Sequence, residues 1–272
     1  MKRKLLSLTA SITACGAVSA TITFHSDFDE TDLGAITGLN IDTPNTDIGT
    51  TDSGTVTLNT ANQTLDLAAN GANTWSAREG SPIAWVSAPS VALGEKWYAE
   101  TQLTHTDSTG GNSEFDQAGM TFYSGILGNN PGSENTGTHQ SLFVGINDWN
   151  AWAHRVQGFA DNNPDVSADA SVGDNNFFYR VEITENGTSD LYNFFYKEDA
   201  ADAWTQFGAT DFAQDFDNSA VGMILKSHNN NTTASTEFNY FEVGTIDPVP
   251  EPSTGLLAGL AGLSLAFRRR RK

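Results

Sequence analysis

The stretch that decides the fold is Tyr179-Arg180-Val181-Glu182-Ile183-Thr184, in which apolar and polar side chains alternate. A period of two places the apolar side chains on one face of a β-strand and the polar ones on the other. The same pattern recurs in Trp97-Tyr98-Ala99-Glu100-Thr101-Gln102-Leu103 and in Phe238-Asn239-Tyr240-Phe241-Glu242-Val243. Strands of this kind predict sheets with one face in a hydrophobic core.

Turn-forming residues follow the first of these stretches. Glu185-Asn186-Gly187-Thr188-Ser189 contains an Asn-Gly pair and predicts a hairpin loop that joins two long strands directly. A second cluster, Ser227-His228-Asn229-Asn230-Asn231, predicts another hairpin loop on the same grounds.

Short alternating or apolar segments recur along the chain between clusters of Gly, Asn, Asp, Ser and Thr, with no long run of helical period. Two sheets packed face to face would bury the many Phe, Val and Leu side chains of one domain of this length. The expected fold class is therefore all-β, a two-sheet antiparallel sandwich. The expected strands are 22–28, 55–59, 64–68, 83–86, 97–106, 117–124, 141–146, 153–159, 177–184, 191–197, 204–208, 221–226 and 235–243.

The charge of the chain is unevenly distributed. Its 272 residues include 14 Lys and Arg against 33 Asp and Glu, a formal net charge of -19. Eight of the basic residues lie at the two ends, and without them the formal net charge would be -27. Such an acidic chain would repel nucleic-acid phosphates, and its single cysteine, Cys15, excludes an internal disulfide and a Cys-based zinc site.

The N-terminus has the order of an export signal. Lys2-Arg3-Lys4 is followed by an uncharged run and then by Val18-Ser19-Ala20, whose small residues suit a signal peptidase, so residues 1–20 are expected to be a secretory signal peptide. A buried N-terminal helix is the alternative, although Thr21-Ile22-Thr23-Phe24 changes at once to a strand-like pattern. Ile12-Thr13-Ala14-Cys15 also loosely fits a lipoprotein cleavage box, with Cys15 as the acylated residue.

The C-terminus combines three features in order. Pro250-Glu251-Pro252 is held extended by its prolines, the apolar run Gly255–Phe267 follows, and Arg268–Lys272 closes the chain. The apolar run is shorter than the ~20 residues of a stable transmembrane helix, and the basic tail would keep its end in the cytoplasm. Such a segment predicts transient anchoring in the inner membrane.

These residues resemble the PEP-CTERM sorting signal of Gram-negative bacteria over residues 249–272. The resemblance implies recognition by an exosortase, a membrane-embedded Cys transpeptidase or protease, and export to the cell surface or the extracellular polysaccharide matrix. A plain tail anchor and a basic nucleic-acid tail are the alternatives. The expected organisation is a signal peptide over 1–20, a β-sandwich domain over 21–246 and a sorting signal over 247–272.

The domain itself resembles the concanavalin A-like lectin and glucanase jelly roll through the order of its segments, with Phe24–Phe28 as the first strand. The resemblance implies a sandwich that often binds or cleaves carbohydrate. It rests on Asp116-Gln117-Ala118-Gly119-Met120, Ser141-Leu142-Phe143-Val144-Gly145-Ile146, Phe178-Tyr179-Arg180-Val181-Glu182-Ile183, Leu191-Tyr192-Asn193-Phe194-Phe195-Tyr196, Trp204-Thr205-Gln206-Phe207, Val221-Gly222-Met223 and Phe238-Asn239-Tyr240-Phe241-Glu242-Val243.

No catalytic residue is predicted. Retaining glucanases need two carboxylates about 5 to 5.5 Å apart, and the nearest candidate here is Glu114-Phe115-Asp116. Gln117, Ala118 and Gly119 occupy the places where a further glutamate would stand. The five histidines form no nucleophilic triad and no pair at metal spacing, which favours surface or strand roles for His25, His105, His139, His154 and His228.

No cofactor is required by the sequence, and calcium is the metal that its oxygen ligands would favour. Solvation of an acidic surface is the alternative explanation. The candidate ligands are Asp27 and Asp29 at the end of the first strand, and Asp161, Asp165, Asp169 and Asp174 in what is expected to be a long polar loop.

The best candidate for a ligand-binding segment is Asn147-Asp148-Trp149-Asn150-Ala151-Trp152-Ala153-His154-Arg155. Sugars stack their apolar C–H faces on aromatic rings, and planar polar groups meet their hydroxyls. The candidate residues are Asn147, Asp148, Trp149, Trp152 and Arg155, with Trp75 beside Arg78 as a second place, whereas Trp204 is expected in the core. The alternative is that Trp149, Trp152 or both close the end of the sandwich core.

The sequence leaves three functions open. The first is a secreted, surface-sorted protein that binds polysaccharide or builds the matrix without catalysis, with exosortase and signal peptidase as partners during export. The second is a glycoside hydrolase or polysaccharide lyase with an atypical site. The third is a structural surface protein without a specific ligand.

Overall fold

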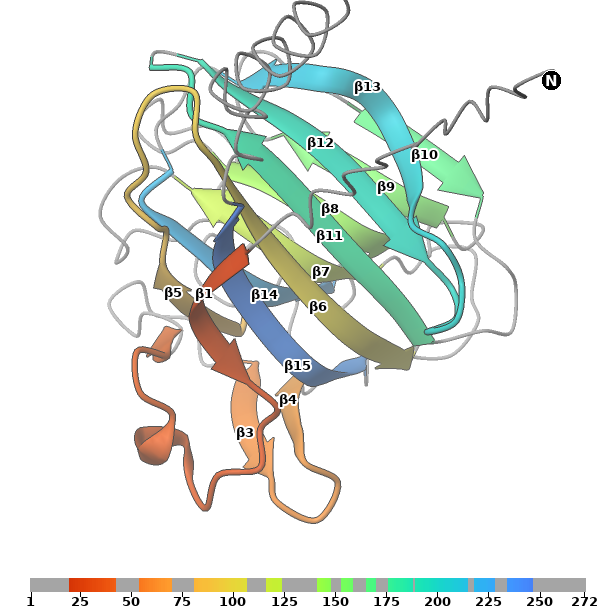
Figure 1. The fold of residues 1–272 in the computed structure, drawn as a ribbon. Helices are drawn as coiled ribbons and strands as arrows, with labels where there is room; N and C mark the ends of the chain where they lie inside the picture. The colour runs from red at the N-terminus through yellow and green to blue at the C-terminus, as the bar shows by residue number, and fades with distance from the viewer. Residues whose placement is uncertain are drawn as a thin grey trace, which may run out of the picture.

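The computed structural model describes residues 20–42, 54–69, 81–106, 116–123, 141–147, 153–158, 165–169, 176–187, 189–214, 218–227 and 234–246. They form two antiparallel sheets stacked face to face, with one short 3-10 helix, η1 (Leu33–Ala35), between β1 and β2 (Figure 1). The expected two-sheet antiparallel sandwich is thereby confirmed.

Sheet A has eight strands, seven of them in the order β13-β12-β11-β6-β15-β4-β3. The remaining strand, β1, pairs with the C-terminal half of β15, whose N-terminal half pairs with β4. The strands are β1 (Ala20–Ser26), β3 (Thr55–Asn59), β4 (Thr64–Ala68), β6 (Lys96–Thr106), β11 (Asn176–Thr184), β12 (Asp190–Lys197), β13 (Thr205–Gln214) and β15 (Ser235–Ile246).

Sheet B has seven strands in the order β10-β9-β8-β7-β14-β5-β2. The strands are β2 (Asn40–Asp42), β5 (Ile83–Ser87), β7 (Asp116–Tyr123), β8 (Ser141–Asn147), β9 (Ala153–Gly158), β10 (Asp165–Asp169) and β14 (Ala220–Ser227). The run β7 to β10 forms an antiparallel meander, so consecutive segments of chain are neighbours in space.

Two strands were not predicted from the sequence, and both lie at the edges of sheet B. β2 and β10 are short and polar, and an edge strand with one neighbour needs few apolar residues. The prediction that Asp165 and Asp169 lie in a long polar loop is therefore wrong, because they are the two ends of β10.

One of the two predicted hairpins is confirmed. Residues 185–189 join β11 and β12, which are direct neighbours, and Gly187 takes a positive φ of 79° there. The second prediction, a hairpin at 227–231, is wrong, since β14 lies in sheet B and β15 in sheet A. Turn residues predict a change of direction, but they carry no information on which sheet the chain enters next.

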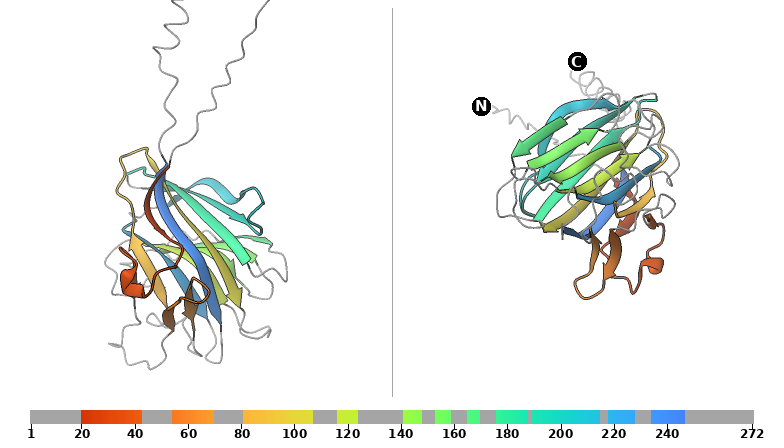
Figure 2. Two further views of the ribbon diagram at one scale, coloured as in Figure 1. Left: turned by 60° about the horizontal axis from the view of Figure 1, so that its bottom comes forward. Right: turned by 180° about the vertical axis from the view of Figure 1, so that it is seen from behind.

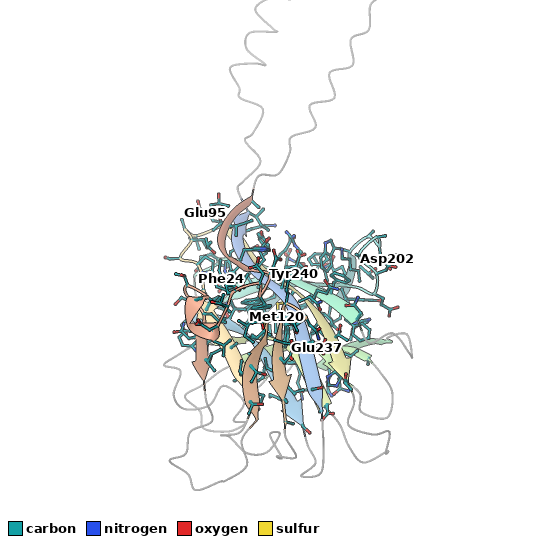
Figure 3. All side chains as sticks on the ribbon, turned by 90° about the horizontal axis from the view of Figure 1, so that it is seen from below. Phe24, Glu95, Met120, Asp202, Glu237 and Tyr240 are labelled. Carbon is teal, nitrogen blue, oxygen red and sulfur yellow. The ribbon has the colours of Figure 1, made fainter. Side chains whose placement is uncertain are left out.

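The core lies between the sheets and is filled by alternate side chains of their strands. In β11 the inward residues Phe177, Tyr179, Val181 and Ile183 are fully buried, as the alternation predicts. Figure 3 shows side chains filling the space between the sheets, Met120 of β7 among them. The prediction that Trp204 is a core residue is wrong.

Trp204 is half-buried just before β13. The Nζ atom of Lys197 lies 4.8 Å from the centroid of its ring and 4.7 Å from that of Phe178. The ring thus covers a lysine on the outer side of sheet A. A large aromatic side chain can be shielded from water by a lysine side chain as well as by a hydrophobic core.

The described domain begins and ends at one place. Ala20, the first residue of β1, is the direct partner of Ile246, the last residue of β15 (Figure 2). The apolar segment 255–267 and residues 1–19 of the expected signal peptide lie outside the described residues, whereas Ala20, the last residue of that expected peptide, begins β1. Within the described part of the chain, no helix is long and apolar enough to cross a membrane.

Candidate functional site

The candidate site lies on the face of sheet B that points away from the core. In β7, Ala118, Met120 and Phe122 belong to the core, so the alternating residues Gln117 and Thr121 point to the outer face. Both are almost completely buried. A buried polar residue on the outer face of a sheet calls for a specific partner.

Five polar residues gather on this face and are named here the sheet B polar cluster. Gln117 Nε2 donates to Gln157 Oε1 at 2.7 Å and to Asn147 Oδ1 at 3.3 Å. Arg155 Nη1 donates to the same Asn147 oxygen at 3.4 Å. Lys226 of β14 is the direct cross-strand partner of Gln117. The cluster thus joins four neighbouring strands, β14, β7, β8 and β9.

One atom of the cluster has an unused hydrogen-bonding capacity. Gln117 is fully buried, and its Oε1 has no hydrogen-bond partner among the described residues. The orientation of the amide follows from its nitrogen, which faces two acceptor oxygens. The oxygen is therefore an acceptor that a ligand hydroxyl or a water would satisfy.

Two glycines lie at the centre of the same face. Gly119 and Gly145 are direct partners on β7 and β8. A Cβ atom at Gly119 would lie 2.2 Å from the carbonyl oxygen of Val144, and one at Gly145 would lie 2.2 Å from that of Ala118. The two strands therefore present backbone here, beside the amides of the polar cluster.

Apolar residues lie beside the polar cluster on the same outer face. Ile83, Phe143, Ala220 and Ile224 form a second cluster of buried residues, with Trp85 packed against it. Phe143 is the direct partner of Thr121 and of Gln157, so the apolar residues adjoin the polar cluster. An apolar surface next to a few placed polar groups is the usual composition of a ligand site.

The structure brings two of the predicted site residues together. Asn147 and Arg155 are 5% and 8% exposed and share a hydrogen bond. The other predicted residues, Asp148, Trp149, Trp152 and Trp75, lie outside the described residues, as do the sorting residues Pro250, Glu251 and Pro252.

Sequence reasoning missed three members of the cluster. Gln117, Gln157 and Lys226 lie in strands whose alternate residues belong to the core. A polar residue at an outward position is what alternation predicts for any surface strand, and only its burial distinguishes it. The one available signal was the Gln at position 117, where the glucanase resemblance would have a carboxylate.

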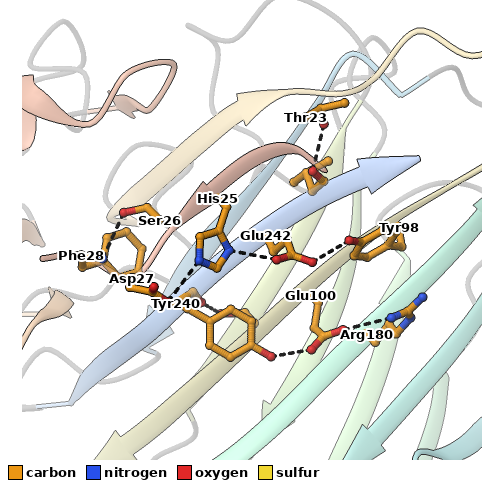
Figure 4. A network of polar contacts seen from close by, with 12 residues as sticks. Thr23, His25, Ser26, Asp27, Phe28, Tyr98, Glu100, Arg180, Tyr240 and Glu242 are labelled. Atoms are coloured by element: carbon orange, nitrogen blue, oxygen red, sulfur yellow. Dashed lines mark hydrogen bonds and ion pairs between the residues drawn. The ribbon is translucent and has the colours of Figure 1, made fainter. Parts of the chain in front are cut away.

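A second polar network lies on the outer face of sheet A (Figure 4). Tyr98 Oη donates to Glu242 Oε1 at 2.5 Å, and Tyr240 Oη donates to Glu100 Oε1 at 2.6 Å. Arg180 lies 3.1 Å from the second oxygen of Glu100, and His25 lies 2.9 Å from the second oxygen of Glu242. All four carboxylate oxygens are thus occupied, which favours a structural role.

The electrostatics of this network follow from its contacts. Burial, together with the hydrogen bond to Glu242 and its charge, raises the pKa of Tyr98 well above its usual value. Burial and the charge of Glu100 do the same for Tyr240. Burial lowers the pKa of His25, but its hydrogen bonds to Asp27 and Glu242 and their charges outweigh this, so the net pKa is raised.

The described acidic residues form no metal centre. Within the ranges described above, no group of three His, Cys, Asp or Glu side chains could hold a metal ion. Asp27 lies 3.2 Å from His25 instead. Asp161 and Asp174 are outside the described residues, so the calcium site stays a prediction, checked by a rise in melting temperature on adding calcium.

The structure describes one of the two catalytic candidates, Asp116, and some of the histidines. Glu114 lies outside the described residues, and Asp116 is fully buried at the start of β7. His105 is buried and lies 2.8 Å from Thr236 Oγ1. His154 is buried within β9, as a strand residue.

Residues 248–271 match the PEP-CTERM protein-sorting motif. The C-terminal segment is a PEP-CTERM sorting signal. The motif implies processing by an exosortase, as the sequence resemblance predicted.

Solved structures of a glucanase and of a lectin are similar to this chain in fold. An endo-1,3-beta-glucanase from Streptomyces sioyaensis matches with a TM-score of 0.54 at 12% identity, over 88% of this chain and 100% of that one. A lectin from Bauhinia forficata in complex with GalNAc matches with a TM-score of 0.51 at 10% identity, over 84% and 99%. The described domain therefore has the fold of concanavalin A-like lectins and glucanases.

Larger enzymes are matched only in part. The GH43 protein BlXynB from Bacillus licheniformis aligns at 15% identity with a TM-score of 0.49, over 81% of this chain and 39% of the enzyme. Comparison with curated proteins gave no match.

Proposed function

We propose that this chain is an exported, surface-sorted protein that binds polysaccharide without cleaving it, through the sheet B polar cluster. The observation that carries the proposal is the buried Oε1 of Gln117, which no described residue meets with a hydrogen bond, within a group of amide and guanidinium side chains. Sugar hydroxyls donate and accept hydrogen bonds at once, so they suit a site that offers both.

Two further observations support this choice. The outward positions of β7 carry Gln117, Gly119 and Thr121, groups suited to binding a hydroxyl rather than to transferring a proton. The sorting motif fits export from a Gram-negative cell to its surface or matrix, after signal peptidase and exosortase have acted. A formal net charge near -27 without the basic ends favours a neutral polysaccharide, unless cations bridge the two.

The test is retention of the full chain on immobilised exopolysaccharide of the producing cell, together with a glycan array. We expect Gln117→Leu and Asn147→Ala to reduce retention about tenfold or more, and Trp149→Ala and Trp152→Ala to reduce it if the neighbouring segment contributes. Gln102→Ala is the matched control, because Gln102 bonds to Asn176 on sheet A.

The other outcomes decide between the remaining functions. If the wild-type protein releases reducing sugar and Glu114→Gln does not, the protein is a glycoside hydrolase or a polysaccharide lyase rather than a binding protein. Absence of retention and of cleavage on every glycan would leave a structural surface protein. Equal retention of wild-type and Gln117→Leu protein would move the site away from sheet B.

A further inference from the structure

His154 and Arg155 are consecutive residues of β9 that point to opposite faces of sheet B. Arg155 belongs to the polar cluster, whereas His154 points into the sandwich and is fully buried. Its ring is stacked on that of Tyr196 with centroids 3.8 Å apart, and Phe177 and Tyr179 meet it edge-on at 5.4 and 5.6 Å.

Both ring nitrogens of His154 have partners, and all of them come from sheet A and the residue after β12. Nδ1 lies 2.8 Å from Tyr179 Oη, and Nε2 lies 3.3 Å from Glu198 Oε1. Burial raises the pKa of Tyr179 well above its usual value, so its hydroxyl keeps the proton and donates to Nδ1. The neutral ring with its proton on Nε2 then donates to Glu198, and both bonds are satisfied.

Within sheet B, β9 pairs with β8 over all six of its residues and with β10 over five of them. β9 is six residues long and lies between β8 and the five-residue end strand β10. Its inward side chains that the structure describes are His154 and Val156. His154 therefore ties β9 to β11 and β12 across the sandwich, and its neighbour Arg155 projects from the same strand into the polar cluster.

Protonation would remove this arrangement. A second proton on the ring would occupy Nδ1, and the Tyr179 hydroxyl would lose its acceptor. The titratable groups that face the ring are Tyr179 on β11, and Tyr196 and Glu198 on and after β12. Burial lowers the pKa of His154 and Glu198 opposes this, with the net pKa lowered, so the ring is neutral at pH 7.

We propose that His154 is the positioning residue of the site: its neutral ring holds β9 so that Arg155 and Gln157 meet Asn147 and Gln117, and its protonation loosens β9 and releases the ligand. The loosening of β9 does not depend on the proposed function. The release of a ligand does, because it requires that the polar cluster binds one. The device would make binding weaker in acid.

The first experiment measures hydrogen exchange of the amides of residues 153–158 in the full chain, from about pH 8 to about pH 5, corrected for intrinsic exchange. We expect protection to fall about tenfold in acid in the wild-type protein. His154→Phe keeps a stacked ring without either hydrogen bond, so its protection should be low at every pH. If the amides of residues 153–158 in His154→Phe were as protected as in the wild-type protein, with the same dependence on pH, the proposal would be overturned.

Two further variants keep the test decisive if His154→Phe folds poorly. Glu198→Gln keeps an acceptor oxygen but removes the charge that raises the pKa of His154, so the transition should move to lower pH. His25→Asn is the matched control, because His25 titrates on the outer face of sheet A and should leave the profile of β9 unchanged. An unmoved midpoint in Glu198→Gln would also overturn the proposal.

The second experiment follows retention on the exopolysaccharide over the same pH range. Wild-type affinity should fall about tenfold in acid, and the affinity of Glu198→Gln should fall at lower pH. If no variant binds any polysaccharide, the proposed function fails while hydrogen exchange still decides the role of His154. Binding that is independent of pH while β9 loosens would refute the coupling of His154 to the ligand.

Discussion

Glu100 of β6 and Glu242 of β15 are direct cross-strand neighbours, and each carboxylate accepts a hydrogen bond from a tyrosine hydroxyl. Like charges placed opposite each other destabilise a sheet. The hydroxyls of Tyr240 and Tyr98 and the guanidinium of Arg180 offset this repulsion at the centre of sheet A. The stability of this sheet should therefore respond to the loss of single donors and to pH.

Replacing Tyr98 by Phe removes the hydroxyl that donates to Glu242 and leaves the ring. We expect the free energy of unfolding to fall by about 1.5 kcal/mol, since bonds to a charged group are the stronger ones. Urea denaturation at pH 7 measures this. Tyr196→Phe is the control, because the Tyr196 hydroxyl has no hydrogen-bond partner among the described residues; equal losses in both variants would contradict the prediction.

His25 should give the protein a pH-dependent share of its stability. Its folded pKa is raised, so this contribution is complete below the unfolded value of about 6.5 and is lost as pH rises through the folded value. With its side chain 39% exposed, the contribution is small, about 0.5 kcal/mol. Denaturation from pH 5 to pH 9 should show it in wild-type protein and not in His25→Asn.

The glycine pair of sheet B should tolerate no side chain. Gly119→Ala would place a Cβ atom 2.2 Å from a backbone oxygen that cannot turn aside, and we expect a loss of about 3 kcal/mol in the free energy of unfolding. Gly94→Ala is the comparison, since Gly94 has open space around it and only a positive φ of 83°. That strain costs about 1 kcal/mol. Equal melting temperatures of the two variants would disprove the close approach of β7 and β8.

Replacing Gln117 should weaken polysaccharide binding while leaving the stability of the fold nearly unchanged. Gln117→Leu removes two hydrogen bonds together with a buried oxygen that has no partner in the described part of the chain, so the free energy of unfolding should change by less than about 1 kcal/mol. Retention on polysaccharide should fall at the same time. A large loss of stability would show that the amide serves the fold rather than a ligand, and thermal denaturation beside the retention assay distinguishes the two.

Much of the fold could be predicted because the strands are regular. The alternation in β6, β11 and β15 follows from one buried and one outer face, and every strand that the pattern predicts is present. Edge strands such as Asp165–Asp169 carry a weaker pattern because one side of them has no neighbour. Trp204 was misplaced because a large aromatic side chain can be buried against a lysine outside the core.

The candidate site was predictable only in the segment rich in polar and aromatic residues. Asn147 and Arg155 were found because they lie near each other in the sequence. Gln117 lies 40 residues from Gln157, its partner at 2.7 Å, and no local pattern relates the two. Composition identifies residue types suited to a ligand, whereas the pairing of strands determines which of them meet.

By itself the sequence determined most of the strands, their hydrophobic faces and the sorting motif at the C-terminus, because these depend on the order of neighbouring residues. Tertiary structure alone decided that β14 and β15 enter different sheets, that Gln117 is buried on an outer face, and that His154 reaches Glu198 across the sandwich. Strand order and register are set by the packing of both sheets together, over distances along the chain that no local period spans.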